Sequence, residues 1–258
     1  MNAMRCVDRI PVKTAVSPRS RLGFTLIELF VALGIILVLM ALLLPARRTG
    51  REASRRTQCR NNLKQIGLAL HNYESKYGAF PPAYTVDADG KPLHSWRTLI
   101  LPFLDQAALY GTIDLSKPWD DPANLAANQT TVPAYACPSA PTQAYTQTVY
   151  LAVVTPSSAF CPNQPRKISE IKDGTDQTLL VIEAPSKQSV HWMSPLDADE
   201  ATILGSFHRE NEAHDHHHTG GEHALLADGT VRFLSQNLDP KTTLALISAA
   251  SHDTVGEF

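Results

Sequence analysis

An uncharged apolar stretch near the N-terminus, interrupted by one glutamate, constrains this chain more than any other feature. Residues 24–44 carry no charge except at Glu28, and their 21 residues match the ~20 that an α-helix needs to cross a hydrocarbon core of ~30 Å. A carboxylate at the centre of a membrane helix is unfavourable by roughly 2.5–3.5 kcal/mol. The stretch therefore predicts a membrane-spanning helix, and it indicates that Glu28 has a function.

The residues that open this stretch resemble the cleavage signal of type IV prepilins and type II secretion pseudopilins. A basic leader, residues 1–23, ends at Gly23, and Phe24 begins the run Phe-Thr-Leu-Ile-Glu. The resemblance implies that prepilin peptidase cuts between Gly23 and Phe24 and that the new N-terminal residue is methylated. It also implies that Glu28 sets the register between subunits by pairing with the new α-amino group, whose unperturbed pKa is ~8. An uncleaved anchor and a secretory signal peptide are the alternatives, but the apolar core of a signal peptide has only about 7–15 residues.

The charge balance bears on partners and on localisation. Loss of the leader would leave 18 basic and 24 acidic side chains, so nothing favours a nucleic-acid partner. The basic leader predicts that the N-terminus stays in the cytoplasm. Several arginines just after residue 46 would lie on the outer side of the membrane and oppose that orientation. The predicted orientation therefore depends on the cleavage motif and not on the charge count. We expect a single-pass protein of the bacterial inner membrane, with segment 24–46 for spanning and assembly and domain 47–258 in the periplasm or on the cell surface.

Three cysteines remain after the leader is removed, namely Cys59, Cys137 and Cys161. An odd number in an oxidising compartment indicates one disulfide and one free thiol. A bond between Cys59 and Cys137 would tie the long helix to the rest of the domain and is the preferred pairing. A bond between Cys137 and Cys161 is the competing one.

The patterning predicts an α+β fold of the pilin-like kind, in which one long helix packs on an antiparallel β-sheet with loop-rich insertions. The helix is expected over 24–77, because Leu63, Ile66 and Leu70 recur at helical spacing beyond the apolar stretch. The other expected elements are strands over 149–155 and 178–183, a hairpin over 224–234 and a closing helix over 238–250. In that hairpin Asp228-Gly229 favours a type I′ turn, which needs positive φ at both residues.

Two further patterns resemble an uncharacterised bacterial family of prepilin-type proteins. The run over 55–73 is similar to the family's signature, and His218 followed after nine residues by Asp228-Gly229 is similar to its C-terminal H-x9-DG motif. The resemblance implies an architecture and a processing route, because the function of the family's domain is unknown. We expect His218 to make a structural hydrogen bond to the Asp228 turn.

A histidine-rich run is the densest group of metal-ligating side chains in the sequence. Imidazoles bind zinc and other divalent transition metals. The candidate ligands are His214, His216, His217 and His218, with Asp228, His208 or His223 as a further ligand. The alternative is a polar loop without a bound metal. A calcium ion is a separate candidate, and its ligands would be Asp197, Asp199 and Glu200.

The sequence predicts a structural subunit and no enzyme. It contains neither a glycine-rich phosphate loop nor a G-x-S-x-G elbow. The expected partners are prepilin peptidase, other pilin-like subunits and the assembly machinery of the inner membrane, in a type II secretion or type IV pilus-like fibre. The alternative is a membrane-anchored module at the cell surface that binds a metal, sugar or peptide.

Overall fold

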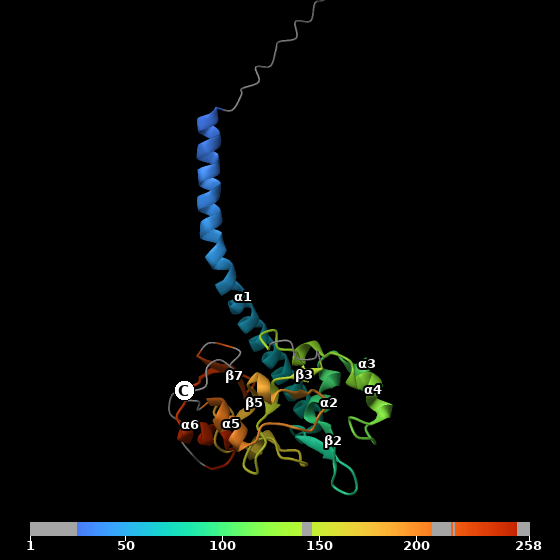
Figure 1. Cartoon of the computed structure of the whole chain (residues 1–258). Coiled ribbons are helices and arrows are strands. Elements are labelled where there is room, and N and C mark those ends of the chain that lie inside the picture. The colour runs from blue at the N-terminus through green and yellow to red at the C-terminus, as the bar shows by residue number, and fades with distance from the viewer. Residues whose placement is uncertain (1–24, 141–145, 208–217, 219, 252–258) are drawn as a thin grey trace, which may run out of the picture. The chain divides into compact units, whose positions relative to one another are not determined.

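A computed structural model describes residues 25–140, 146–207, 218 and 220–251, without the side chains of 41–50. The chain divides into two compact units, residues 1–48 and 49–258. The first helix, α1 (Leu26–Tyr77), begins in the first unit and ends in the second. Figure 1 shows the second unit, where the strands and the remaining helices lie.

The first unit contains the apolar start of α1. Its large hydrophobic side chains between Leu26 and Met40 are 51–75% exposed. Among the described residues, no helix is both long enough and apolar enough to cross a membrane. The membrane-spanning character predicted for 24–44 is therefore not supported by this structure, which in that stretch describes side chains only for 25–40.

A four-stranded antiparallel sheet forms the centre of the second unit. Its strand order is β4-β5-β7-β8, and its strands are β4 (Tyr150–Ala152), β5 (Leu179–Glu183), β7 (Gly221–Leu226) and β8 (Val231–Ser235). Successive side chains of a strand point to opposite faces, and this sheet is buried on both. Val181 and Leu225 pack on one face, while Ile182, Ala224 and Leu226 pack on the other.

The second half of α1 covers the first face, and two C-terminal helices cover the second. Leu63, Ile66 and Leu70 of α1 belong to the same core as Val181 and Leu225, as their helical spacing predicts. On the other face, α5 (Glu200–Phe207) and α6 (Pro240–Ile247) pack against each other (Figure 1). The hydrophobic side chains that these helices contribute to the core on this face are Ile203, Phe207, Leu246 and Ile247.

The helix α1 lies close to β7 and to the turn after it, and a glycine allows the close approach at each place. A Cβ on Gly67 would lie 2.7 Å from Cδ1 of Leu225, and a Cβ on Gly229 would lie 3.2 Å from Nε2 of His71. Gly229 follows β7, so His71 of α1 lies against the turn at the C-terminal end of that strand.

Short helices and two-stranded ribbons fill most of the chain between α1 and α5 outside the central sheet. The ribbons pair β1 (Tyr84–Val86) with β2 (Pro92–Ser95) and β3 (Gln147–Thr148) with β6 (Val190–His191). The short α-helices are α2 (Trp96–Leu99), α3 (Ala107–Tyr110) and α4 (Leu125–Asn128). The 3-10 helices are η1 (Leu101–Phe103), η2 (Pro122–Asn124), η3 (Pro133–Tyr135), η4 (Ile168–Glu170) and η5 (Ser186–Gln188).

The predicted α+β class, with an N-terminal helix and antiparallel sheets, is confirmed. The type I′ turn is wrong. Gly229 has φ of +84°, but Asp228 is not among the described residues with positive φ. Asp228 instead accepts hydrogen bonds from the backbone N and Oγ1 of Thr230 at 2.8 and 2.7 Å. Because that side chain ties the loop together, the positive φ is needed at Gly229 alone.

Candidate functional site

The cleavage position of the prepilin signal, Gly23 and Phe24, lies outside the described residues. Glu28 is described, and it lies in the first turn of α1. Its Oε2 accepts hydrogen bonds from the backbone N and Oγ1 of Thr25 at 2.8 and 2.9 Å, and its own backbone N lies 3.4 Å from Oγ1 of Thr25. This reciprocal pattern is a capping box. The sequence shows it as Thr-x-x-Glu, a local role for Glu28 that our sequence analysis missed.

The structure brings Cys59 and Cys137 together. Their sulfur atoms lie 2.7 Å apart as neighbouring thiols, and no disulfide joins them. Cys59 comes from α1, and Cys137 follows η3. Cys161 lies elsewhere, where its carbonyl accepts a hydrogen bond from the backbone N of Ala83.

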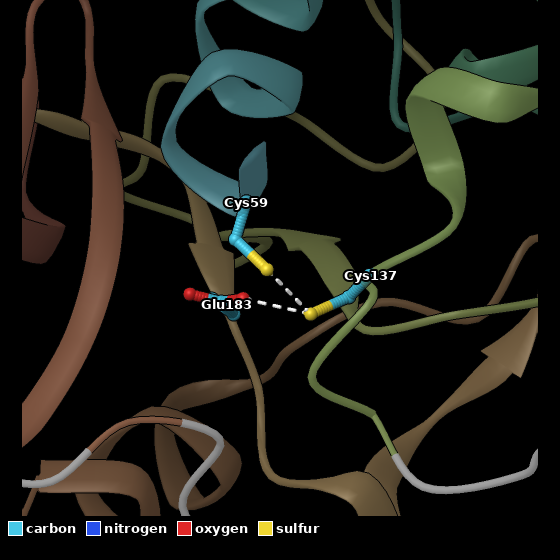
Figure 2. A group of neighbouring side chains, drawn as sticks. All are labelled: Cys59, Cys137 and Glu183. Atoms are coloured by element: carbon cyan, nitrogen blue, oxygen red, sulfur yellow. Dashed lines mark hydrogen bonds between the residues drawn. The ribbon is translucent and has the colours of Figure 1, made fainter. Parts of the chain in front are cut away.

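A buried carboxylate lies beside this thiol pair. Glu183 is the last residue of β5, and its side chain is fully buried. The thiol of Cys137 donates to its Oε1 at 3.2 Å. Figure 2 shows Cys137 between the sulfur of Cys59 and the Glu183 carboxylate. Glu183 is the one charged residue in an otherwise apolar strand. This pattern in the sequence could have indicated a site residue, but we did not assign one there.

Two histidines lie against the other oxygen of the same carboxylate. Nδ1 of His223, on β7, is 3.2 Å from Oε2 of Glu183, and Nε2 of His218 is 3.4 Å from it. The two imidazole rings meet edge to face, with centroids 5.1 Å apart. Both side chains are almost fully buried. Cys59, Cys137, Glu183, His218 and His223 thus form one cluster, which we call the Cys-His-Glu cluster.

The charges inside the Cys-His-Glu cluster are strongly coupled. A hydrogen bond from Cys137 lowers the pKa of the Cys59 thiol to about 6, against the opposing effect of burial. The same contact, together with burial, raises the pKa of Cys137. Burial lowers the pKa of His218, but the contacts with Cys59 and Glu183 outweigh burial and raise it to about 10. The arrangement therefore favours a thiolate at Cys59 next to an imidazolium at His218.

The structure tests the histidine-run prediction at one position. His214, His216 and His217 lie outside the described residues, and of the four predicted ligands only His218 is described. The groups of ligating side chains in the described part of the chain are Cys59, Cys137, Glu183 and Glu183, His218, His223. His223 was considered as a further ligand, whereas the two cysteines were expected to form a disulfide.

The structure does not support the candidate calcium site, and the reason is physical. Oδ1 of Asp197 lies 2.7 Å from Nη1 of the buried Arg97 and also accepts hydrogen bonds from Trp96 and Ala152. Asp199 accepts from the backbone N of Thr202 at the start of α5. These carboxylates hold protein groups together, and they do not converge on a common point in the described residues.

The expected hydrogen bond from His218 to the Asp228 turn is also wrong. His218 precedes β7 and faces Glu183, while Asp228 follows β7 and bonds to Thr230. The six residues of the strand between them span about 20 Å at ~3.3 Å per residue. The H-x9-DG spacing therefore contains the whole of one strand, with His218 before it and the turn that lies against α1 after it.

Comparison with known proteins supports the reading of both ends of α1. Residues 18–44 match the prokaryotic N-terminal methylation motif, and residues 48–158 match a family described as a protein of unknown function (DUF1559). No curated protein and no solved structure matches the chain. The chain therefore carries the N-terminal methylation motif of prepilin-type proteins, followed by a segment similar to the uncharacterised DUF1559 family.

Proposed function

We propose that the chain is a structural, pilin-like subunit of a type II secretion or type IV pilus-like fibre. Prepilin peptidase would cleave it between Gly23 and Phe24, and residues 24–44 would then assemble with other pilin-like subunits. Before assembly the chain would be a single-pass protein of the bacterial inner membrane, with domain 47–258 in the periplasm or on the cell surface. The role is structural and involves no catalysis.

The observation that carries this proposal is the apolar surface at the start of α1, within the match to the methylation motif. Large hydrophobic side chains between Leu26 and Met40 are exposed on every side of the helix. A helix that is apolar all round is stable when its surroundings bury it, and burial stabilises by roughly 25 cal/mol per Å² of apolar surface. Lipid before assembly and neighbouring helices after it would supply that burial.

The architecture of the second unit supports the same proposal. An antiparallel sheet packed on the second half of the N-terminal helix is the arrangement that the resemblance to pilins implies. Residues 24–44 would supply the cohesion of the fibre, and the domain that follows would lie on its surface.

A binding module at the cell surface is the second candidate, because the Cys-His-Glu cluster gathers metal-ligating side chains. The two candidates differ in what the N-terminal helix does. A tethered binding module would remain a monomer held by one helix, whereas a fibre subunit would crosslink to neighbouring copies through that helix.

The first experiment tests processing and assembly in the native host. Gly23→Val should block cleavage, so that the chain runs as an unshifted band on a gel and keeps Met1 in mass spectrometry. The wild-type chain should begin at a methylated Phe24 and should form crosslinks between neighbouring copies. A wild-type chain that begins at Met1 in the cell would contradict the proposal.

The second experiment separates the two roles of Glu28. Glu28→Gln keeps an oxygen that can accept from Thr25, because glutamine also forms a capping box, but it removes the negative charge. Glu28→Ala removes both. We expect both variants to be cleaved and neither to enter fibres, because pairing with an α-amino cation needs the charge. Normal assembly of Glu28→Gln, with failure of Glu28→Ala, would assign Glu28 to helix capping and would contradict its role in register.

A further inference from the structure

The Cys-His-Glu cluster is built from segments that lie far apart in the sequence. Cys59 comes from α1, Cys137 from the segment after η3, Glu183 from β5, and His218 and His223 from the region of β7. Four of these five residues are buried and Cys137 is half-buried. A protein interior rarely gathers five ionisable groups without a charge that compensates them, because each loses its hydration on burial.

The distances suit ligands around one ion. With bonds of about 2.0–2.3 Å in a tetrahedral arrangement, neighbouring ligand atoms lie about 3.3–3.8 Å apart. Oε1 of Glu183 lies 3.2 Å from the sulfur of Cys137, and its other oxygen, Oε2, lies 3.4 Å from Nε2 of His218. His218 also interacts with the thiol of Cys59. Cys59, Cys137 and Glu183 form one group of neighbouring donors, and Glu183 also belongs to a second group with His218 and His223. For one ion to be held by Cys59, Cys137, Glu183 and His218, the sulfurs would have to separate by about 1 Å from 2.7 Å, and one oxygen of Glu183 would have to turn toward the point that all four donors face.

One donor in this set lacks a well-formed partner. Nε2 of His218 is buried and makes no hydrogen bond of good geometry in the described residues, although it lies near Cys59 and Glu183. A buried polar nitrogen in that position is unfavourable by about 1–3 kcal/mol. A metal ion between the imidazole and the thiolates would accept the lone pair of Nε2 of His218.

The donor types select the metal. Thiolate, imidazole and carboxylate together are typical ligands of zinc, whereas calcium takes oxygen ligands. With two thiolates, one carboxylate and a neutral imidazole around Zn²⁺, the site has a net charge of −1. Arg56 and Arg60 line a cavity of about 470 Å³ that His223 also lines, so positive charge that would balance this negative charge lies on that side of the cluster.

We propose that Cys59, Cys137, Glu183 and His218 bind one structural zinc ion, and that His223 is a positioning residue that orients the Glu183 carboxylate. Binding displaces the thiol protons and the proton of His218, because the ion is held by thiolates and a neutral imidazole. The ion joins α1 to β5 and to the start of β7. The proposal does not depend on fibre assembly, and either one can fail without the other.

The competing outcome is the disulfide between the same two sulfurs. It needs a sulfur–sulfur bond of about 2.05 Å and would consume both thiolates. It would also leave Glu183, His218 and His223 together in the interior with no cation other than their own protons. The two outcomes predict different thiol counts and different metal contents.

The experiment uses the full chain, purified in detergent from cells supplied with zinc sulfate. We expect one zinc per chain by mass spectrometry of the metal, and three reactive thiols per mature chain after denaturation and chelation. Replacing zinc with Co²⁺ should give a thiolate-to-cobalt charge-transfer band. A zinc-free chain with one Cys59–Cys137 disulfide would overturn the proposal.

Variants test the ligand set. Cys59→Ser, Cys137→Ser and His218→Gln should each lose stoichiometric zinc, whereas His223→Gln should weaken binding by about 10–100-fold, as second-layer changes do. Cys161→Ser and a triple His214→Ala, His216→Ala, His217→Ala variant are the matched controls, and both should keep the zinc. Loss of zinc in the triple variant, with retention in Cys59→Ser and His218→Gln, would overturn the proposal. Circular dichroism identifies variants that fail to fold, and for these the Co²⁺ spectrum of the wild-type chain decides whether two thiolates are ligands.

Discussion

At the scale of the residue, a buried ion pair shows how distant segments of the second unit are held together. Arg97 is fully buried, and its guanidinium lies 2.7 Å from Asp197 and donates to the carbonyl of Leu196 at 2.7 Å. Its own backbone carbonyl accepts from the hydroxyl of Tyr135 at 2.7 Å. The pair therefore connects α2, η3 and the segment before α5, none of which is close to another in sequence.

Removal of one partner should destabilise the domain strongly. Arg97→Met keeps most of the side-chain volume but leaves the Asp197 carboxylate buried without its cation, a loss of about 3–5 kcal/mol. Urea denaturation of the purified chain should show a lower midpoint than in the wild type. Arg51→Met is the control at an exposed position, for which a change within about 0.5 kcal/mol is expected. Equal stability of Arg97→Met and the wild type would show that the pair contributes nothing.

The same pair should give the domain a pH-dependent stability. Burial raises the pKa of Asp197 to about 6, although Arg97 opposes the shift, and an unfolded aspartate has a pKa near 4. The folded chain therefore binds more protons between these values, so stability falls as the pH rises from about 4 to 6. The full effect of two pKa units is roughly 3 kcal/mol. Thermal unfolding across this range should show the decline in the wild type and a smaller one in Asp197→Asn. Equal slopes would refute this assignment.

At the scale of the element, the hairpin β7–β8 depends on a glycine that the sequence analysis did not single out. Gly221 has φ of +156°, and a Cβ there would lie 2.0 Å from the backbone oxygen of Leu234. That oxygen belongs to the neighbouring strand, so the clash cannot be relieved by a side-chain rotation. Only a residue without a Cβ allows the two strands to pair at this register.

Gly221→Ala should therefore open the start of the hairpin. We expect a loss of more than 2 kcal/mol, because the backbone of β8 must move. Gly220→Ala is the matched control, since Gly220 also has positive φ, +91°, but open space around it. It should lose about 1–2 kcal/mol for the conformation alone. Similar losses in the two variants, measured by urea denaturation, would show that the clash is unimportant.

Hydrophobic periodicity predicted the elements well where one face is buried. It predicted poorly the features that depend on contacts between distant parts of the chain. The helical spacing of Leu63, Ile66 and Leu70 predicted which side of α1 meets the sheet, and the structure places all three in the core. The turn at Asp228 could not be predicted in type, because a side-chain hydrogen bond to Thr230 selects it. The neighbours of His218 could not be predicted either, since Glu183 and Cys59 reach it only through the pairing of β5 with β7 and the packing of α1.

At the scale of the whole molecule, the chain separates a region that offers apolar surface from a region that buries its own. In the described residues, every buried hydrophobic side chain lies at Cys59 or beyond, while the large exposed hydrophobic side chains are concentrated between Leu26 and Met40. The division at residues 48 and 49 follows the same line. The second unit therefore contains its own core.

A chain that begins at Thr49 should accordingly fold without the first unit. We expect its thermal midpoint to lie within a few degrees of that of the full chain, because no described core residue is removed. Circular dichroism of both chains, the full chain in detergent, provides the comparison. A large drop in the midpoint would mean that residues before Thr49 stabilise the domain. Leu63→Ala in the shorter chain is the destabilised reference, with an expected loss of about 2–5 kcal/mol.

The position of Cys59 has a mechanical consequence. Among the described side chains of α1 it is the first that is fully buried, and it is where the helix meets Cys137 and Glu183 of β5. If an extending filament pulls on the helix from its N-terminal side, the tension reaches this point before any other part of the core. The strength of the bonds at Cys59 would then set the load at which the domain begins to rupture, and a coordinated ion or a covalent bridge would raise that load above what side-chain packing alone provides.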